Sequence, residues 1–328
     1  MTAMIDAATR IQRVHRRRIA PACTKYTAKA HSQMHKGKMN TYTYHALRKT
    51  GLFGHVSKLR DHVAYKVLAF KERSVSNAHI AYAYALRKLH KSEKVRGFRT
   101  TNRGDNIAKR GLMTMAGVHG TGEGWNHGAT LPHRWGETKA PENTMLEMLM
   151  LDHVCAFEKI LMETLPGYVR YLQETVANAN GTPFTLTPLG ITTSVAISTS
   201  YVAGAHCDGR ERIWSAILFV CVQSVSHWTF HAGNHTYELP TTPGMGRLII
   251  LKSREIEHGT CYTSAGTEDH LNMGTVICFD QLMKTALEHW KTGVSTSDIP
   301  ITQKGGEIAE DALRYCASMR ESARELGW

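Results

Sequence analysis

The chain has 328 residues, enough for one large hydrophobic core or two smaller ones, and carries a net charge of +12. Residues 1–110 hold 25 Lys and Arg against 5 Asp and Glu, whereas the remainder holds 15 against 23. No apolar run approaches the length of a membrane span, and seven cysteines without a C-x-x-C pair exclude a disulfide scaffold or a zinc ribbon. We therefore expect an intracellular, reduced, nuclear protein with no membrane contact.

The basic front of the chain predicts a polyanionic partner, and we expect this partner to be nucleic acid. A solvated helical surface and a basic localisation signal at 16–18 are the alternatives. Residues 1–40 are basic and polar, a composition typical of partial disorder. The apolar spacing predicts helices over 54–72 and 76–94. Residues 96–143 are expected to be loops, with a mobile flap at the glycine-rich stretch 117–128.

The second half of the chain changes from helical to strand patterns. A long helix is predicted over 144–177, interrupted at Pro166-Gly167, and further helices over 281–291 and 306–326. Between them, alternating or continuous apolar runs predict strands over 193–201, 213–221, 243–251 and 274–279. The expected fold is α+β: a jelly-roll (double-stranded β-helix) core buttressed by helices. The expected divisions are a basic, mostly helical DNA-contacting region (1–115), the barrel (116–300) and a C-terminal helix (301–328).

The chemistry of the chain is concentrated in His206-Cys207-Asp208 and, 52 residues after His206, in His258. Two histidines and one carboxylate form the facial ligand set of non-haem Fe(II) sites. Residues i and i+2 of a strand project from the same face, so His206 and Asp208 can bind one ion together, with His258 arriving from a later strand. Alternatively, both histidines are ordinary barrel residues and Asp208 caps the turn at Gly209.

These residues, their strand context and the basic front resemble the ten-eleven-translocation/J-binding-protein (TET/JBP) family of Fe(II) dioxygenases, over residues 145–290. The resemblance rests on His206-Cys-Asp208, the turn and strand of 243–251, His258 and the strand ending at Phe279. It implies an enzyme, an Fe(II)-dependent dioxygenase (oxidoreductase) that uses O2. The implied partner is double-stranded DNA containing a methylated base, above all 5-methylcytosine. Since a stacked base is inaccessible, the base must be flipped into the site.

One departure from the family concerns the co-substrate. Members place an arginine about one strand beyond the second histidine, where it holds 2-oxoglutarate, whereas here no Lys or Arg occurs between His258 and Lys284. Either another basic residue anchors 2-oxoglutarate, or the co-substrate is ascorbate, as in an algal branch of the family. That branch has a carboxylate shortly after the His-x-Asp, and Glu211 occupies a comparable place, although a plain surface charge is the alternative. The candidate co-substrate residues are Glu211, Arg210, Arg212, Arg247 and Asn272.

The remaining candidates are chosen by proximity in sequence. Residues expected to contact the flipped base are Tyr201, Trp214, Asp269 and His270. Residues expected to contact the DNA backbone are Arg48, Lys58, Arg60, Arg96, Arg99 and Arg103. A zinc site at His227, His231 and His235 is disfavoured, because their flanks predict strand and turn.

Other functions stay open at this point. The same barrel can act on thymine, N6-methyladenine, RNA, protein or a small molecule. A metal-free DNA-binding module is the alternative of a different class. We expect a monomer, although the sequence leaves the oligomeric state open.

Overall fold

The computed structural model of the protein describes residues 58–60, 63–70, 73–91, 99–100, 112–117, 141–179, 181–200, 205–208, 214–223, 228–262, 271–278 and 303–328. Three predicted segments fall largely or wholly outside these ranges: the basic segment 1–40, the glycine-rich stretch 117–128 apart from Gly117, and the helix over 281–291.

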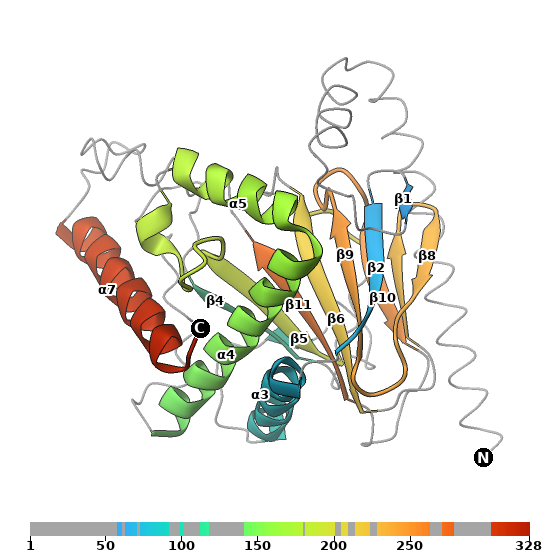
Figure 1. Cartoon of the computed structure of the whole chain (residues 1–328), viewed down its shortest axis with the longest axis horizontal. Helices are drawn as coiled ribbons and strands as arrows, with labels where there is room; N and C mark the ends of the chain where they lie inside the picture. Colours follow the sequence, from blue (N-terminus) through green and yellow to red (C-terminus); the bar gives the residue numbers. More distant parts are fainter. Residues whose placement is uncertain are drawn as a thin grey trace.

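The fold is built on two antiparallel sheets that face each other (Figure 1). The larger has the order β1-β2-β9-β6-β11-β5-β4-β3, and the smaller has the order β10-β7-β8. The strands of the larger sheet are β1 (Lys58–Arg60), β2 (Val63–Ala69), β3 (Arg99–Thr100), β4 (Leu112–Gly117), β5 (Ser194–Thr199), β6 (Ser215–Gln223), β9 (Met245–Leu251) and β11 (Leu271–Cys278). Those of the smaller sheet are β7 (Trp228–Ala232), β8 (His235–Glu238) and β10 (His258–Tyr262).

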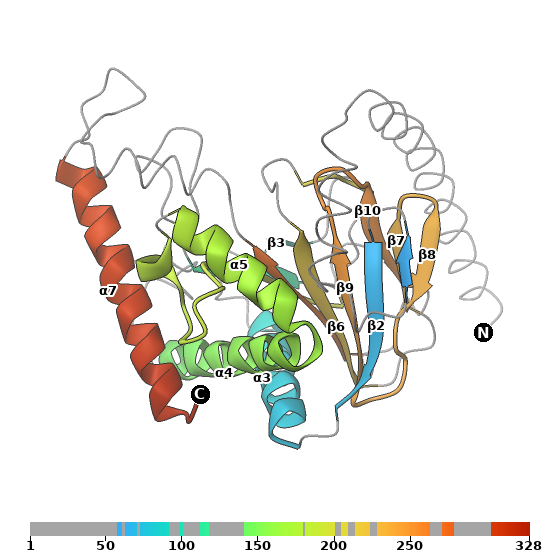
Figure 2. The ribbon, with the colours of Figure 1, turned by 45° about the horizontal axis from the view of Figure 1, so that its top comes forward.

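Helices cover the face of the larger sheet that is turned away from the smaller one (Figure 2). They are α3 (Arg73–Lys91), α4 (Pro141–Thr164), α5 (Pro166–Asn178) and α7 (Gln303–Glu325), with a short 3-10 helix, η3, at Thr182–Phe184. The predicted helix over 76–94 is confirmed as α3, and that over 306–326 as α7. The predicted break at Pro166 is also confirmed, because proline fits the first turn of a helix but not its interior.

The alternation of side chains along the central strands divides the apolar interior into two cores. In β9, Leu248 and Ile250 belong to the core beneath the helices, whereas Ile249 and Leu251 belong to the core between the sheets. β6 is buried over almost its whole length on both faces, which explains its continuous apolar run. The core between the sheets is aromatic, and the ring centroids of Phe219 and Phe230 lie 5.3 Å apart.

The described strands form two facing antiparallel sheets, and the jelly-roll arrangement stays a prediction. Segment 205–208 adds to the edge of the smaller sheet through an isolated bridge between His206 and His258. Eight strand segments from β5 to β11 are then shared between two facing sheets, with β5, β11, β6 and β9 on one side. A double-sheet jelly roll has eight strands arranged in this way. Helices and antiparallel sheets together make the chain a mixed α and β protein, as expected.

The predicted helix over 54–72 is wrong, because β1 and β2 occupy most of it. Val63, Tyr65 and Val67 alternate with period two, and β2 pairs along its length with β9. The same apolar residues also fit a helical spacing, but pairing with a buried strand decides the outcome. β3 and β4 likewise lie where loops were expected, so strands from the basic front extend the same sheet.

Two further findings concern composition. Within the described ranges, no helix is long and apolar enough to cross a membrane. Among the described residues, Cys155, Cys207, Cys221 and Cys316 are free thiols.

Candidate metal centre

The three predicted metal ligands meet at one end of the smaller sheet. His206 and His258 form an antiparallel bridge in which each backbone N–H donates to the other's carbonyl, at 3.0 and 2.9 Å. The N–H of Asp208 donates to the carbonyl of Ser253 at 3.0 Å. The backbone therefore fixes both ends of the His-Cys-Asp segment against the chain that leads into β10.

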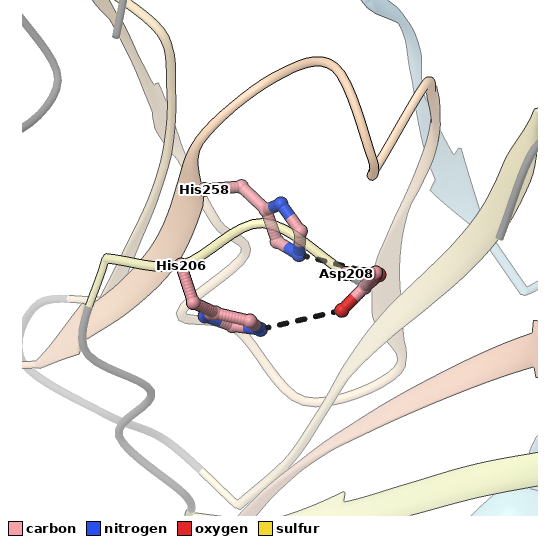
Figure 3. A group of neighbouring side chains, drawn as sticks. All are labelled: His206, Asp208 and His258. Atoms are coloured by element: carbon pink, nitrogen blue, oxygen red, sulfur yellow. Dashed lines mark ion pairs between the residues drawn. The ribbon is translucent and has the colours of Figure 1, made fainter. Parts of the chain in front are cut away.

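The three side chains point toward one another (Figure 3). His206 Nε2 lies 3.6 Å from Asp208 Oδ1, and His258 Nε2 lies 3.8 Å from Asp208 Oδ2. One ligand atom from each residue can be chosen so that all three lie within 4.8 Å of one another. Among the residues that the structure describes, this is the one group of His, Cys, Asp or Glu close enough to hold a metal ion.

A hydrogen bond to the Ile256 carbonyl orients His258 as a ligand. Its Nδ1 lies 2.9 Å from the carbonyl of Ile256, so Nδ1 carries the proton and Nε2 presents a lone pair toward Asp208. Burial lowers the pKa of His258, and the neighbouring His206 lowers it further, while Asp208 and the hydrogen bond to Ile256 oppose this shift. The neutral imidazole that a metal requires is therefore favoured at neutral pH.

The donor set fits a divalent transition metal. Ligand atoms about 2.1 Å from an ion and at right angles to one another lie about 3 Å apart. The two histidine–aspartate separations, 3.6 and 3.8 Å, exceed that value by less than 1 Å, and the three ligand atoms all lie within 4.8 Å of one another, so the side chains would move inward to bind an ion. Two imidazoles with one carboxylate are a ligand set that suits iron. Magnesium and calcium instead prefer sets made of oxygen ligands only.

Access to the centre is one-sided. The side chain of His258 is 7% exposed and packs against Phe230, with ring centroids 6.0 Å apart. Those of His206 and Asp208 are 46% and 32% exposed. A substrate would therefore approach across His206 and Asp208, whereas His258 forms the inner wall. Glu257 is buried nearby, and burial raises its pKa, although the proximity of His206 counteracts this.

Two of the candidate co-substrate residues face the core between the sheets. Arg247 shares its face of β9 with Ile249 and Leu251, and it pairs across the sheet with Phe219. Asn272 shares its face of β11 with Val276, which packs against the same core. The Asn272 side chain is buried, and its Nδ2 makes no hydrogen bond. Arg210, Glu211 and Arg212 lie outside the described residues.

Of the candidates for the base pocket, the structure describes only Trp214, which does not line the metal centre. Trp214 is 1% exposed and lies in the core beneath the helices, where the Tyr168 hydroxyl donates to its carbonyl at 2.5 Å. That position suits a core residue and leaves no ring face open for a base. Lys58 and Arg60 lie in β1, and Arg99 lies in β3. Outside the described residues lie Tyr201, Asp269, His270, Arg48, Arg96 and Arg103.

The disfavoured zinc site falls partly within the described chain. The predicted strand and turn are confirmed, since His231 lies in β7 and His235 begins β8. The ring nitrogens of His231 are matched by threonine hydroxyls instead, with Thr229 Oγ1 at 3.1 Å from Nε2 and Thr236 Oγ1 at 2.9 Å from Nδ1. His227 lies outside the described residues.

Sequence reasoning missed the residues that hold the ligands in place. Ser253 and Ile256 act through their backbone carbonyls, which any side chain could supply, so the sequence carries no signal for them. The inward orientation of Arg247 could have been found by counting alternate positions along β9 from the buried Ile249 and Leu251.

No protein-family model and no curated protein sequence matches the chain. Solved structures that resemble it include NgTET1 in complex with 5mC DNA, with 11% identity, coverage of 68% of this chain and 74% of that one, and a TM-score of 0.44. OsALKBH1 has 14% identity, coverage of 67% and 98%, and a TM-score of 0.36. A Pseudomonas putida prolyl-4-hydroxylase has 12% identity, coverage of 70% and 100%, and a TM-score of 0.33.

At such identities and TM-scores, these likenesses identify neither the family of this chain nor its substrate, and the resemblance to the TET/JBP family stays a prediction. The chain's own side chains support a narrower conclusion. Two histidines and an aspartate, preset by backbone hydrogen bonds at one end of the smaller sheet, form a candidate transition-metal centre.

Proposed function

We propose that the protein is an Fe(II)-dependent dioxygenase with a double-stranded β-helix core that flips and oxidises a methylated base in DNA, with 5-methylcytosine as the first candidate. The observation that carries the proposal is the convergence of His206, Asp208 and His258 within 4.8 Å, with one side of the group exposed. Three ligands on one face leave positions for a co-substrate and for oxygen, which is the arrangement typical of non-haem iron oxygenases.

The protein's own residues would prepare this chemistry. When bound, Fe(II) would supply the activation of O2. His258, held neutral by burial and oriented by the Ile256 carbonyl, would keep its lone pair on the ion. The aromatic core around Phe230 and Phe219 would exclude water from the inner side of the site.

We further propose that a carboxylate or ascorbate co-substrate extends from the metal toward the inner faces of β9 and β11. Arg247 lies on the inner face of β9, and its guanidinium can bind a carboxylate through two parallel hydrogen bonds. The unbonded amide of Asn272 lies on the inner face of β11, near the position where the family carries its arginine. Arg247 would therefore replace the missing arginine if 2-oxoglutarate is the co-substrate.

The proposed DNA partner follows from charge. The first 110 residues hold 25 basic against 5 acidic residues, which is the electrostatic signature of a polyanion-binding surface. Binding to duplex DNA should then weaken steeply with added salt. The nuclear location and the monomeric state expected from the sequence belong to this proposal.

The test begins with anaerobic reconstitution with Fe(II), followed by mass spectrometry of nucleosides from DNA containing 5-methylcytosine. Reactions would contain 2-oxoglutarate alone, ascorbate alone or neither. Asp208→Ala should abolish both iron binding and product. His231→Ala is the matched control, because it removes a histidine from the same sheet whose ring contacts threonine hydroxyls rather than the centre.

The outcomes separate the candidate functions. Product with 2-oxoglutarate that is lost in Arg247→Leu would support Arg247 as the anchor, and product with ascorbate alone would assign the other co-substrate. Iron binding without product on 5-methylcytosine DNA would refute this substrate and favour thymine, N6-methyladenine, RNA, protein or a small molecule. Failure of the wild-type protein to bind iron would refute the dioxygenase and favour a DNA-binding module.

A further inference from the structure

The loop between β9 and β10, residues 252–257, is hydrogen-bonded to two of the metal ligands, Asp208 and His258, and is linked to the third through His258. Ser253 accepts a hydrogen bond from the N–H of Asp208, at 3.0 Å. Ile256 accepts one from His258 Nδ1, at 2.9 Å. The loop ends at His258, whose backbone exchanges two hydrogen bonds with His206. The position of this loop therefore sets the position of the whole ligand group.

The loop is itself held at two points. Its turn is closed by the Lys252 carbonyl, which accepts from the N–H groups of Glu255 at 2.9 Å and Ile256 at 3.0 Å. Its first part is tied to the larger sheet by the hydroxyls of Ser253 and Ser215, whose oxygens lie 2.8 Å apart. Both serines are fully buried, and Ser215 begins β6 opposite Leu251. The carbonyl that holds Asp208 and the hydroxyl that meets β6 thus belong to one residue.

This arrangement connects a buried hydroxyl pair to a metal ligand through a single residue. Metal sites lose affinity when their ligands move by about 0.5 Å, and groups that orient ligands typically contribute about 10- to 100-fold in affinity. Removal of the hydroxyl pair would leave the turn at Lys252 intact but would remove this contact between Ser253 and β6.

We propose that Ser253 and Ser215 are positioning residues for the metal, acting on Asp208 through the Ser253 carbonyl. The inference rests on the proposed metal site. Ser253→Ala and Ser215→Ala should each weaken metal binding about tenfold. The double variant should weaken binding no further, because either substitution alone already breaks the pair.

The experiment is an anaerobic titration of the full chain with Co(II), in which the visible absorption of bound Co(II) gives the affinity. Thermal unfolding of each metal-free protein is measured alongside. Ser198→Ala is the matched control, since its hydroxyl lies in the same sheet and donates to the Gly274 carbonyl at 3.2 Å instead. It should bind Co(II) as the wild type does. His258→Ala, which removes a ligand outright, should bind Co(II) more weakly than either serine variant.

Wild-type affinity in Ser253→Ala or Ser215→Ala would overturn the inference while leaving the proposed function standing. So would a tenfold loss in each single variant that multiplies to a hundredfold loss in the double, because the hydroxyls would then act separately. If Ser253→Ala does not fold, Ser215→Ala decides, since it removes the same hydrogen bond from β6. Absence of Co(II) binding by the wild type would refute the proposed function and the inference together.

Discussion

Lowering the pH from 7 to 5 should destabilise this protein strongly through a histidine pair that is remote from the metal centre. His79 of α3 and His153 of α4 are fully buried, with their Nδ1 atoms 2.7 Å apart. His153 Nε2 also lies 2.6 Å from the Thr275 hydroxyl of β11. A contact between two Nδ1 atoms holds one proton, so a second proton would set two N–H groups against each other.

The magnitude follows from the pKa shifts. Burial lowers the pKa of His79 from 6.5 to about 3. Burial, reinforced by His79, lowers the pKa of His153 well below its ordinary value. Because the folded-state pKa values are depressed, the stabilisation is complete above pH 6.5 and is lost as the pH falls toward 3. Between pH 7 and 5, protonation of His79 in the unfolded state should lower the free energy of unfolding by about 2 kcal/mol, and His153 should add to this loss; a typical stability is roughly 5–15 kcal/mol.

The assay is urea unfolding followed by circular dichroism at pH 7, 6 and 5. The variant His79→Leu/His153→Leu removes both histidines but leaves the buried Thr275 hydroxyl without its contact to His153 Nε2, so it should be about 1–3 kcal/mol less stable than the wild type at pH 7. Between pH 7 and 5 it should lose at least about 2 kcal/mol less stability than the wild type loses. Other titrating groups, including His258, are common to both proteins and cancel in the difference. His231→Ala should keep the wild-type pH dependence. Equal pH dependence in the wild type and the double variant would refute the reasoning.

Three further predictions concern stability. Burial raises the pKa of Glu158 to about 7, so the contribution of Glu158 to stability is complete below pH 4.5 and is lost as the pH rises through 7. The wild type should therefore lose about 2–3 kcal/mol of the free energy of unfolding between pH 5 and 8, measured by urea unfolding. Glu158→Gln should remove this loss. Gly274→Ala should destabilise the protein by about 1–3 kcal/mol in the same assay, because its Cβ would lie 2.9 Å from Ser198 Oγ and 3.2 Å from the Phe219 ring. An unchanged unfolding midpoint would show that the neighbouring side chains can shift to accommodate the methyl group. Arg320→Ala should lower the melting temperature through a loss of about 1–3 kcal/mol, because the Arg320 guanidinium donates to the carbonyls of Pro183 and Thr185. Arg324 is exposed, and Arg324→Ala should leave the melting temperature unchanged.

The sequence predicted the parts of the fold whose patterns have one interpretation. β6 was predicted because its apolar and small residues form an almost uninterrupted run, and the α4–α5 break because Pro166 cannot continue a helix. β2 was missed because Val63, Val67 and Leu68 fit both a helical and a strand spacing, and only pairing with β9 decides between them. Local patterns do not report such long-range pairing.

The same distinction applies to the candidate site. His206 and Asp208 could be paired from sequence because positions i and i+2 share a face of an extended chain. The contacts of the 252–257 loop with the ligands could not be predicted from the sequence. They are made by the backbone carbonyls of Ser253 and Ile256, and every residue has a carbonyl. Trp214 was chosen as a base-pocket candidate because it lies close to the motif in the sequence. Closeness in sequence does not decide which face of the sheet a side chain occupies, and the Trp214 side chain lies in the core beneath the helices.

The bridge between His206 and His258 has a consequence for how the protein folds. The two histidines are separated in the sequence by β6, β7, β8 and β9, so their bridge is a long-range contact. Closing such a long loop costs chain entropy that must be lost before the distant contact compensates for it, so we expect this bridge to form late in folding. The complete set of three ligands exists only once the bridge has formed. The appearance of high-affinity metal binding during refolding should therefore report the formation of this bridge.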